Sequence, residues 1–137
     1  RGLGDVYKRQ VQMLAEYNIP LIEDDLYGDV FFRHSRPKPC KAFDEKGLVL
    51  WCGSVSKTLA PGYRVGWIAP GKFKDAVIRQ KHIHLISTPT LNQEAIANFM
   101  EKADMRIIYA GCAMNYIPTV FIWHNLLPTI SPKTLKS

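Results

Sequence analysis

A lysine preceded by hydroxyl groups and followed by an arginine is the first feature of the sequence that could do chemistry. Residues 53–67 read GSVSKTLAPGYRVGW, with Ser54 and Ser56 before Lys57 and Arg64 seven residues after it. In a partly desolvated site beside other cations, a lysine loses its proton more readily and can attack an aldehyde. Hydroxyl groups and a guanidinium, which donates two parallel hydrogen bonds, suit a phosphate. The pattern predicts a nucleophilic lysine beside phosphate-binding groups.

A run of carboxylates before a tyrosine forms the second constellation. Residues 22–29 read IEDDLYGD, and Asp24 stands 33 residues before Lys57. The apolar run Pro20–Ile22 predicts a buried strand, and ligands of open α/β sheets bind at the carboxyl ends of strands. An aspartate there can pair with a protonated ring nitrogen. An aldehyde, a phosphate and a ring nitrogen together describe pyridoxal 5'-phosphate (PLP).

These two segments resemble the cofactor site of class I/II aminotransferases of the type I fold. The pair EDDLYGD and GSVSKTLAPGYRVGW is most similar to the aminotransferase-like domains of MocR-type regulators of the GntR family, and 2-aminoadipate-type transaminases carry similar motifs. The resemblance covers roughly residues 11–103. It implies an α/β fold in which this chain is an internal fragment of the large PLP-binding domain, with a mostly parallel sheet flanked by helices.

The resemblance also implies a role for each motif residue. Asp24 corresponds to the acid that holds the pyridine nitrogen, and Tyr27 to the tyrosine that hydrogen-bonds the phenolic oxygen of the cofactor. Lys57 corresponds to the lysine that forms the internal aldimine and moves the substrate proton. The phosphate-binding groups correspond to Ser54, Ser56 and Arg64.

Two functions share this cofactor site. The first is amino-group transfer between an amino acid and a 2-oxo acid, by a homodimer in the cytoplasm. The second is a PLP-binding effector domain of a DNA-binding transcription regulator, whose winged helix-turn-helix would lie outside this chain. We do not expect the fragment to act alone, because the family's small domain and upstream aromatic residue are missing. A non-catalytic α/β module is a third interpretation, and it predicts no PLP binding.

Plainer structural roles stay open for the same residues. The carboxylates of Asp24, Asp25 and Asp29 also suit strand-end caps, and most lysines lie at the surface, as Lys57 would then do. Serines such as Ser54 and Ser56 are common in turns, and Arg64 also suits an ion pair with an acid. For Trp51 and Trp67, within strand patterns, we expect core positions.

The elements that must position the motifs follow from the apolar pattern. A helix is expected to end at Tyr17, before Asn18 and Pro20, and further strands at Leu48–Cys52 and Arg64–Ala69. A helix is expected from Gly71 to about Ile86, with Phe73, Val77 and Ile83 near one face. Thr90 and Gln93 fit a capping box ahead of an amphipathic helix; its apolar residues are Leu91, Ala95, Ile96, Phe99 and Met100.

Composition excludes several other classes of protein. With 47% hydrophobic and 22% charged residues, the chain is neither a disordered tail nor a fibrous repeat. Three separated cysteines without a CxxC pair argue against a disulfide framework, and the histidines lack metal-ligand spacing. The net charge of +6 divides equally among residues 1–10, 11–103 and 104–137, so no basic stripe predicts a nucleic-acid interface.

Both ends of the chain differ from the middle. Residues 1–10, RGLGDVYKRQ, resemble a translated cloning adapter. Residues 107–132 contain no Asp, Glu, Lys or Arg, yet Asn115, Pro118 and His124 interrupt them, which argues against a membrane span. We therefore expect native sequence in 11–103, an adapter-like segment in 1–10 and a frameshifted tail in 104–137.

The tail hypothesis predicts a specific reading frame. Starting at the third base of the Asp104 codon, synonymous codon choices allow a frame that begins YAHYLRRLCHEL, which resembles the basic helix of the family's continuation. Sequencing the source DNA across this codon is expected to reveal a frame change there. An intact frame that continues as written would refute the hypothesis.

Overall fold

The computed structural model describes residues 3–31, 35–59, 61–103 and 108. Its three α-helices, three strands and three 3-10 helices (η) follow one another along the chain as α1 (Leu3–Glu16), β1 (Leu21–Asp24), η1 (Cys40–Phe43), β2 (Val49–Ser54), η2 (Pro61–Tyr63), β3 (Gly66–Ala69), η3 (Gly71–Phe73), α2 (Lys74–Leu85) and α3 (Thr90–Lys102). Helix α1 ends at Glu16, one residue before the expected end at Tyr17, and each predicted strand is present. The predicted α/β class is confirmed.

The three strands form one mixed sheet in the order β1–β2–β3. Strands β1 and β2 are parallel, with Leu21 opposite Val49 and Asp24 opposite Cys52. Strand β3 returns antiparallel to β2, with Ser54 opposite Gly66. The crossover between the parallel strands carries η1, whereas β2 and β3 are joined by the loop that contains Lys57.

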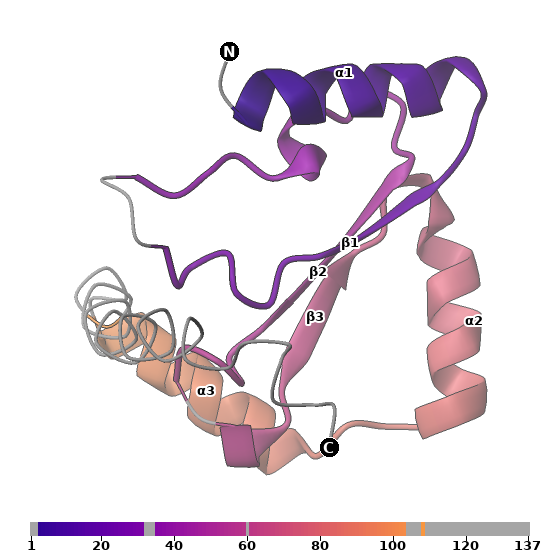
Figure 1. Cartoon of the computed structure of the whole chain (residues 1–137). Coiled ribbons are helices and arrows are strands. Elements are labelled where there is room, and N and C mark those ends of the chain that lie inside the picture. The colour runs from indigo at the N-terminus through magenta and orange to yellow at the C-terminus, as the bar shows by residue number, and fades with distance from the viewer. Residues whose placement is uncertain (1–2, 32–34, 60, 104–107, 109–137) are drawn as a thin grey trace, which may run out of the picture.

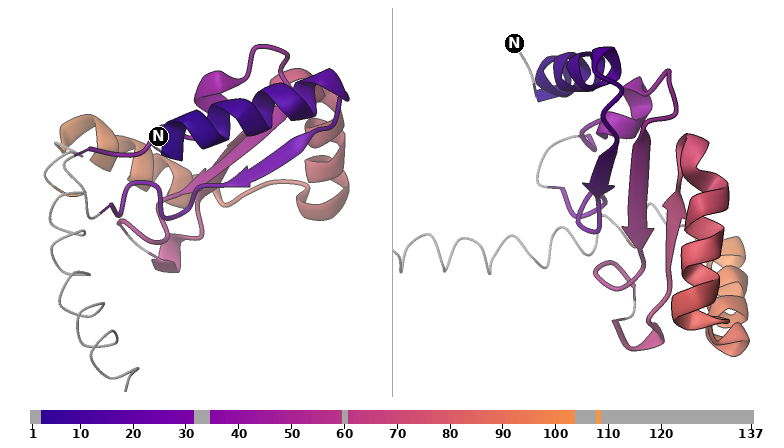
Figure 2. Two further views of the ribbon diagram at one scale, coloured as in Figure 1. Left: turned by 45° about the horizontal axis from the view of Figure 1, so that its top comes forward. Right: turned by 90° about the vertical axis from the view of Figure 1, so that its right-hand side faces the viewer.

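Helices cover the sheet on both faces. Helix α1 and η1 lie on one side of the strands and α2 on the other, as the two turned views show (Figure 2). Helix α3 lies away from α1, near the end of the sheet where β2 finishes (Figure 1). Because β1 and β2 are parallel, the loops that follow them lie at one end of the molecule.

The core lies between α1, η1 and the first two strands. Val11, Cys40 and Val49 are buried there, and Tyr7, Leu21 and Phe43 pack against them. Tyr7 and Val11 are one helical turn apart, which places both on the face of α1 that meets the sheet. Burial of this apolar surface fastens α1 to the start of the parallel pair.

Glu23 connects η1 to the sheet on the face that packs against α1. Its carboxylate accepts hydrogen bonds from the backbone N–H groups of Cys40 (2.6 Å) and Lys41 (2.9 Å). Burial, reinforced by the Glu23 charge, raises the pKa of the Cys40 thiol to about 11. Glu23 is therefore engaged at the start of η1 and is separated from the exposed Asp24 beside it.

Asp44 connects the end of η1 to the start of β2. Its side chain, only 2% exposed, accepts hydrogen bonds from the N–H groups of Leu48 (2.9 Å) and Val49 (3.0 Å) and pairs with Lys41 at 2.9 Å. Burial acts to raise the pKa of Asp44, but the hydrogen bonds from Lys41, Val49 and Leu48 outweigh it and lower the pKa. The ionised carboxylate is the form that the fold stabilises.

The second half of the chain departs from several expectations. Phe73 and Val77 are half-buried beside the sheet, as predicted, but Ile83 is 73% exposed. On α3 only Ile96 is buried, among the five apolar residues expected on one face. Trp67, expected in the core, is 39% exposed. Among the described residues, no further layer covers these surfaces.

The predicted capping box does not form. The N-cap of α3 is Pro89, so Thr90 already belongs to the helix, and no side chain caps it. The Gln93 amide donates to the Thr88 carbonyl at 3.3 Å instead of returning to an N-cap backbone. The prediction placed the helix start one residue late. The proposed boundaries at residues 10 and 104 stay predictions; α1 includes residues 3–10, and the tail lies outside the described residues except for Ile108.

The lowered pKa of Asp44 predicts acid-sensitive stability. Its contribution is complete above the unfolded pKa, near 3.9, and is lost as the pH falls through the lower folded pKa. Asp44→Asn in the full-length polypeptide should lower the free energy of unfolding by about 1–3 kcal/mol at pH 7. Urea denaturation followed by fluorescence should show this difference shrinking below about pH 4. The exposed neighbour Glu45→Gln is the control; an equal loss in both variants would contradict the role of Asp44.

Candidate cofactor site

The sheet brings the two motifs to one end of its strands. Because β1 and β2 are parallel, Asp24 at the end of β1 and Ser54 at the end of β2 lie at the same end of the sheet. The antiparallel β3 starts opposite Ser54, so the residues just before it return to this end. The Val55 N–H donates to the Val65 carbonyl at 3.3 Å and extends the pairing by one step. Beyond this pair the chain turns at Ser56 and Lys57, and Arg64 directly precedes Val65.

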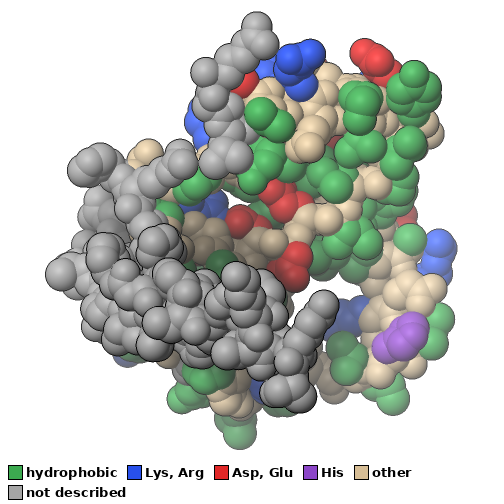
Figure 3. Space-filling model, in the orientation of Figure 1, with side chains coloured by type: hydrophobic (Ala, Val, Ile, Leu, Met, Phe, Trp, Pro, Cys, Tyr) green, Lys and Arg blue, Asp and Glu red, His purple; other side chains and the backbone are tan. Residues whose placement is uncertain are grey.

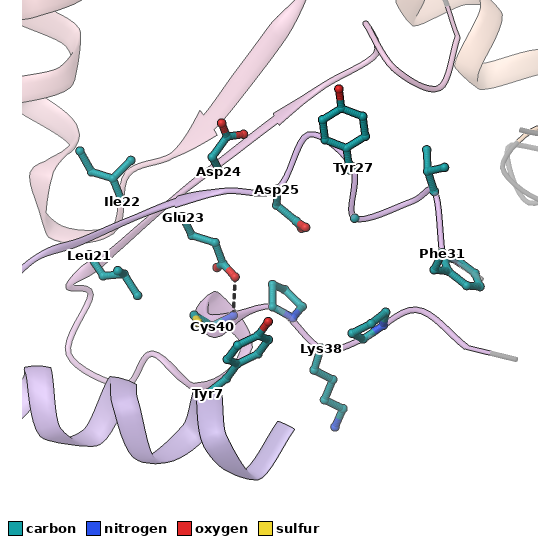
Figure 4. A pocket seen from close by; sticks show the side chains of 14 residues that line it. Tyr7, Leu21, Ile22, Glu23, Asp24, Asp25, Tyr27, Phe31, Lys38 and Cys40 are labelled. Carbon is teal, nitrogen blue, oxygen red and sulfur yellow. Dashed lines mark hydrogen bonds between the residues drawn. The ribbon is translucent and has the colours of Figure 1, made fainter. Parts of the chain in front are cut away.

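Strand alternation separates the carboxylates that follow Ile22. Successive side chains of a strand point to opposite faces, so Asp24 shares a face with Cys52 and Ser54, while Glu23 shares the other with Trp51. Figure 4 shows Asp24 and Tyr27 directed away from Glu23 and Asp25, which point toward the side of η1. Of the adjacent carboxylates, Asp24 is therefore the one on the face of Ser54.

Hydrogen bonds order the segment that carries the lysine. The Ser54 hydroxyl oxygen lies 2.8 Å from the Val65 carbonyl and 2.9 Å from the Ser56 hydroxyl oxygen, and it accepts the Ser56 N–H at 3.0 Å. The Leu59 N–H donates to the Val55 carbonyl at 2.9 Å, which closes a helical turn around Ser56 and Lys57. The short side chain of Ser54 thus ties the lysine loop to the start of β3.

Lys57 is exposed and faces the tyrosine of the first motif. Its Nζ lies 5.3 Å from the centroid of the Tyr27 ring, within the range of a cation–π contact. The Tyr27 side chain is 57% exposed. The contact joins the segments after β1 and β2 through the two side chains predicted to act on the same ring.

Four predicted residues share one hollow of about 940 Å³. Ser54, Ser56, Lys57 and Arg64 line it, together with apolar side chains of β3 and α2. Asp24 and Tyr27 line a second hollow of about 600 Å³ between the turn after β1 and the segment before η1 (Figure 4). Acidic side chains gather in the middle of the face drawn in Figure 3. The structure thus groups the phosphate-binding candidates with Lys57. Asp24 and Tyr27 line a separate hollow, and Tyr27 contacts Lys57.

Arg64 has an unusual backbone conformation. Its φ is +55°, in the left-handed region that costs a residue with a side chain roughly 1–2 kcal/mol. The adjacent Val65 carbonyl receives the Val55 N–H and lies 2.8 Å from the Ser54 hydroxyl. These contacts hold the arginine at the hollow in a conformation that the sequence did not predict.

Sequence reasoning missed two residues at this site. Lys81 lines the hollow of Lys57 from α2; it follows Val77 by four residues, so the helical period could have revealed it. Cys52 pairs with Asp24 across the strands, and burial, with the Asp24 charge as a second cause, raises the pKa of its thiol. This cysteine and aspartate meet only through the strand register, which cannot be read from the sequence pattern alone.

The described ranges contain neither a candidate metal site nor a candidate membrane span. No group of three or more His, Cys, Asp and Glu side chains there is arranged to hold a metal ion. No helix among those residues is both long and apolar enough to cross a membrane.

Comparison with known proteins identifies the family of this chain. The model of aminotransferase class I and II matches residues 4–116. The chain belongs to this family. The resemblance inferred from the two motifs is confirmed, while the individual roles of the six motif residues stay predictions.

Curated relatives of this aminotransferase-family chain include both regulators and enzymes. The uncharacterized HTH-type transcriptional regulator YdcR of Escherichia coli is 40% identical over 90 residues, which are 66% of this chain and 19% of the regulator. The aromatic-amino-acid aminotransferase 1 of Thermococcus litoralis is 44% identical over 62 residues, 45% of this chain and 15% of the enzyme. The chain thus spans about a fifth, or less, of these relatives.

A solved aminotransferase has the same fold over nearly the whole chain. The crystal structure of Pyrococcus horikoshii kynurenine aminotransferase, in complex with PMP, matches with a TM-score of 0.80 at 27% identity. The match covers 93% of this chain and 32% of that structure. The chain is therefore an α/β portion of the aminotransferase fold.

The contact between Asp24 and Cys52 predicts a change in thiol reactivity. Asp24→Asn removes one cause of the raised pKa, so the thiolate fraction of Cys52 should rise. Alkylation of Cys52 at pH 8, followed by peptide mass spectrometry without added cofactor, should become about 2–5 times faster. Cys40, whose raised pKa has no contribution from Asp24, is the internal control. An unchanged rate at Cys52 would contradict the proximity of the two side chains.

Proposed function

We propose that this chain is the PLP-binding portion of an aminotransferase that moves an amino group between an amino acid and a 2-oxo acid. The observation that carries the proposal is the hollow in which Ser54, Ser56, Lys57 and Arg64 meet. Membership of the aminotransferase family and the 5.3 Å contact between Lys57 and Tyr27 support it.

The residues present fit the groups of PLP. The Arg64 guanidinium offers charge-assisted hydrogen bonds to a phosphate in the hollow. The hydroxyls of Ser54 and Ser56 add neutral ones when they turn from their contacts with each other and with the Val65 carbonyl. The exposed amine of Lys57 stands between these groups and Tyr27, so it can reach an aldehyde placed there. None of these four polar side chains is buried in the described part of the chain, so each stays accessible to a ligand of the size of PLP.

Each residue then has a specific task. PLP, when bound, supplies an electron sink that stabilises negative charge at the substrate α-carbon. Arg64, Ser54 and Ser56 hold the phosphate and so fix the position of the ring. The Lys57 amine would hold the cofactor through its aldehyde and, as a free base, would move the α-proton of the substrate.

The residues after β1 would act on the ring itself. The Asp24 carboxylate accepts a hydrogen bond from the protonated ring nitrogen and keeps it charged. The Tyr27 hydroxyl donates a hydrogen bond to the phenolic oxygen. Asp24 lies on the face of Ser54, and Tyr27 faces Lys57, which supports a shared ligand.

A regulatory function is the second candidate. The 40% identity to an HTH-type transcriptional regulator supports a PLP-binding effector domain that acts through a DNA-binding domain in the full-length protein. Both candidates use the same cofactor residues. Conversion of a 2-oxo acid to an amino acid by the PLP-loaded protein, with a second amino acid supplied as the amino donor and recovered as its 2-oxo acid, would favour the enzyme. A PLP-dependent mobility shift of its promoter DNA would favour the regulator.

We also propose that the full-length protein works as a homodimer. Large apolar side chains of α2 and α3 are exposed in the described part of the chain, among them Ile78, Ile83, Leu91 and Phe99. Such surfaces need covering by other parts of the protein or a second copy. Sedimentation of the full-length protein would distinguish a dimer from a monomer.

Lysine substitutions test the proposed cofactor site. The full-length polypeptide with added PLP is expected to develop the absorbance band of lysine-bound cofactor, and Lys57→Ala should abolish it. Lys81→Ala, which removes another lysine of the same hollow, should retain the band. Borohydride reduction followed by peptide mass spectrometry should locate the cofactor on Lys57. A label on Lys81, or no band in the unmodified protein, would refute the assignment.

A further inference from the structure

The turn after β1 is attached to the sheet through Asp25. The backbone N–H of Asp25 donates to the Cys52 carbonyl at 3.0 Å, which continues the ladder one residue beyond β1. Its side-chain Oδ2 accepts the indole N–H of Trp51 at 2.7 Å. Asp25 therefore connects the turn to β2 through both its main chain and its side chain.

Arg36, in the segment before η1, binds the same turn through two of its carboxylates. Its guanidinium contacts Asp25 Oδ2 at 2.5 Å through Nη2 and Asp29 Oδ1 at 2.8 Å through Nε. Arg36 Nε is buried and has no hydrogen-bond partner in the described part of the chain, so its attraction to Asp29 compensates for its lost hydration. One arginine thus bridges two carboxylates on either side of Gly28.

Gly28 makes this arrangement possible. A β-carbon at this position would overlap Asp25 Oδ1 and come within 2.6 Å of Arg36 Nη2. Gly28 also donates its N–H to the Asp25 carbonyl at 3.1 Å. The backbone of the turn therefore lies directly against the ion pair and cannot shift without disturbing it.

We infer that Asp25 and Arg36 are positioning residues for the cofactor-facing side chains of Asp24 and Tyr27. The inference rests on the proposed function. Asp24 precedes Asp25 directly, and Tyr27 follows it by two residues within the same fixed turn. Neither Asp25 nor Arg36 lines the hollow of Lys57. Asp25 borders the second hollow, but its side chain points away from Asp24 and Tyr27 (Figure 4). Their effect on the cofactor therefore passes through the geometry of the turn rather than through direct contact.

The bridge requires an arginine. Its extended, delocalised charge lies close to two carboxylates at once, through Nη2 and Nε, whereas a lysine offers one compact charge that reaches a single partner well. Without Arg36, Asp25 and Asp29 would face each other as like charges beside the exposed Asp24. The turn would then relax away from β2, and the angle between Asp24 and Tyr27 would change.

Variants with matched charge changes distinguish positioning of the turn from a general effect of net charge on the bound cofactor. Arg36→Gln and Asp25→Asn break the same ion pair but change the net charge in opposite directions. Lys41→Gln and Asp44→Asn make the same two charge changes at the ion pair between η1 and β2, remote from the turn. The double variant of Asp25→Asn with Arg36→Gln tests whether the two residues act as one unit.

The visible circular dichroism of bound PLP reports the geometry around the ring. At saturating PLP, Arg36→Gln and Asp25→Asn in the full-length protein are each expected to reduce this signal by about half, in the same direction. The double variant should resemble the more affected single variant, and Arg36→Lys should recover only part of the signal. The two control variants should keep the full signal even if they unfold at lower temperature.

Hydrogen exchange of the cofactor-free protein gives an independent measurement. The peptide that contains residues 24–30 should exchange faster in Arg36→Gln than in Lys41→Gln, because only the former releases the turn. If Arg36→Gln does not fold, the milder Arg36→Lys is compared with Lys41→Gln in both measurements.

The possible results separate this inference from the proposed function. Loss of the signal in the turn variants with retention in the controls supports the inference. Wild-type signals in the turn variants, opposite changes in Arg36→Gln and Asp25→Asn, or equal losses in the controls would overturn it while PLP binding stands. Absence of PLP binding in the unmodified protein would remove the proposed function and the inference together.

Discussion

The register of the parallel pair β1–β2 is the constraint on which the site depends. With Leu21 opposite Val49, these two side chains face the core beneath α1, and Asp24 falls on the other face together with Ser54. A shift of one residue would exchange Asp24 with Glu23 and would turn Leu21 out of the core. The burial of a few apolar residues far from the motifs therefore decides which carboxylate faces the lysine loop.

Neighbouring carboxylates of one motif are divided between structure and chemistry. Glu23 is occupied by the backbone of η1, and Asp25 by Trp51 and Arg36. Asp24, between them, stays exposed, with only a long contact from the Leu26 N–H at 3.4 Å. Because its neighbours are satisfied within the fold, Asp24 remains available to a ligand. The sequence EDD thus encodes two anchors and one exposed carboxylate.

The sequence predicted the elements and the order of the motifs well because strands, helices and turns follow local patterns. It did not predict which surfaces are covered: Trp67 and Ile83 have the pattern of core residues but lack a covering layer in the described structure. It also missed the pairing of Arg36 with Asp25, since a contact across eleven residues of irregular chain has no period. The same limit hid Cys52, which meets Asp24 only through the strand register.

The glycines of the two motifs are constrained by packing. A β-carbon on Gly53 would approach the Trp67 ring within 2.6 Å and the Trp51 ring within 3.0 Å, and one on Gly28 would displace the Asp25–Arg36 pair. Both positions are therefore constrained by the packing of neighbouring side chains, independently of any ligand. The packing residues and the residues of the proposed cofactor site alternate along the same two segments, so each motif serves the fold as well as the site.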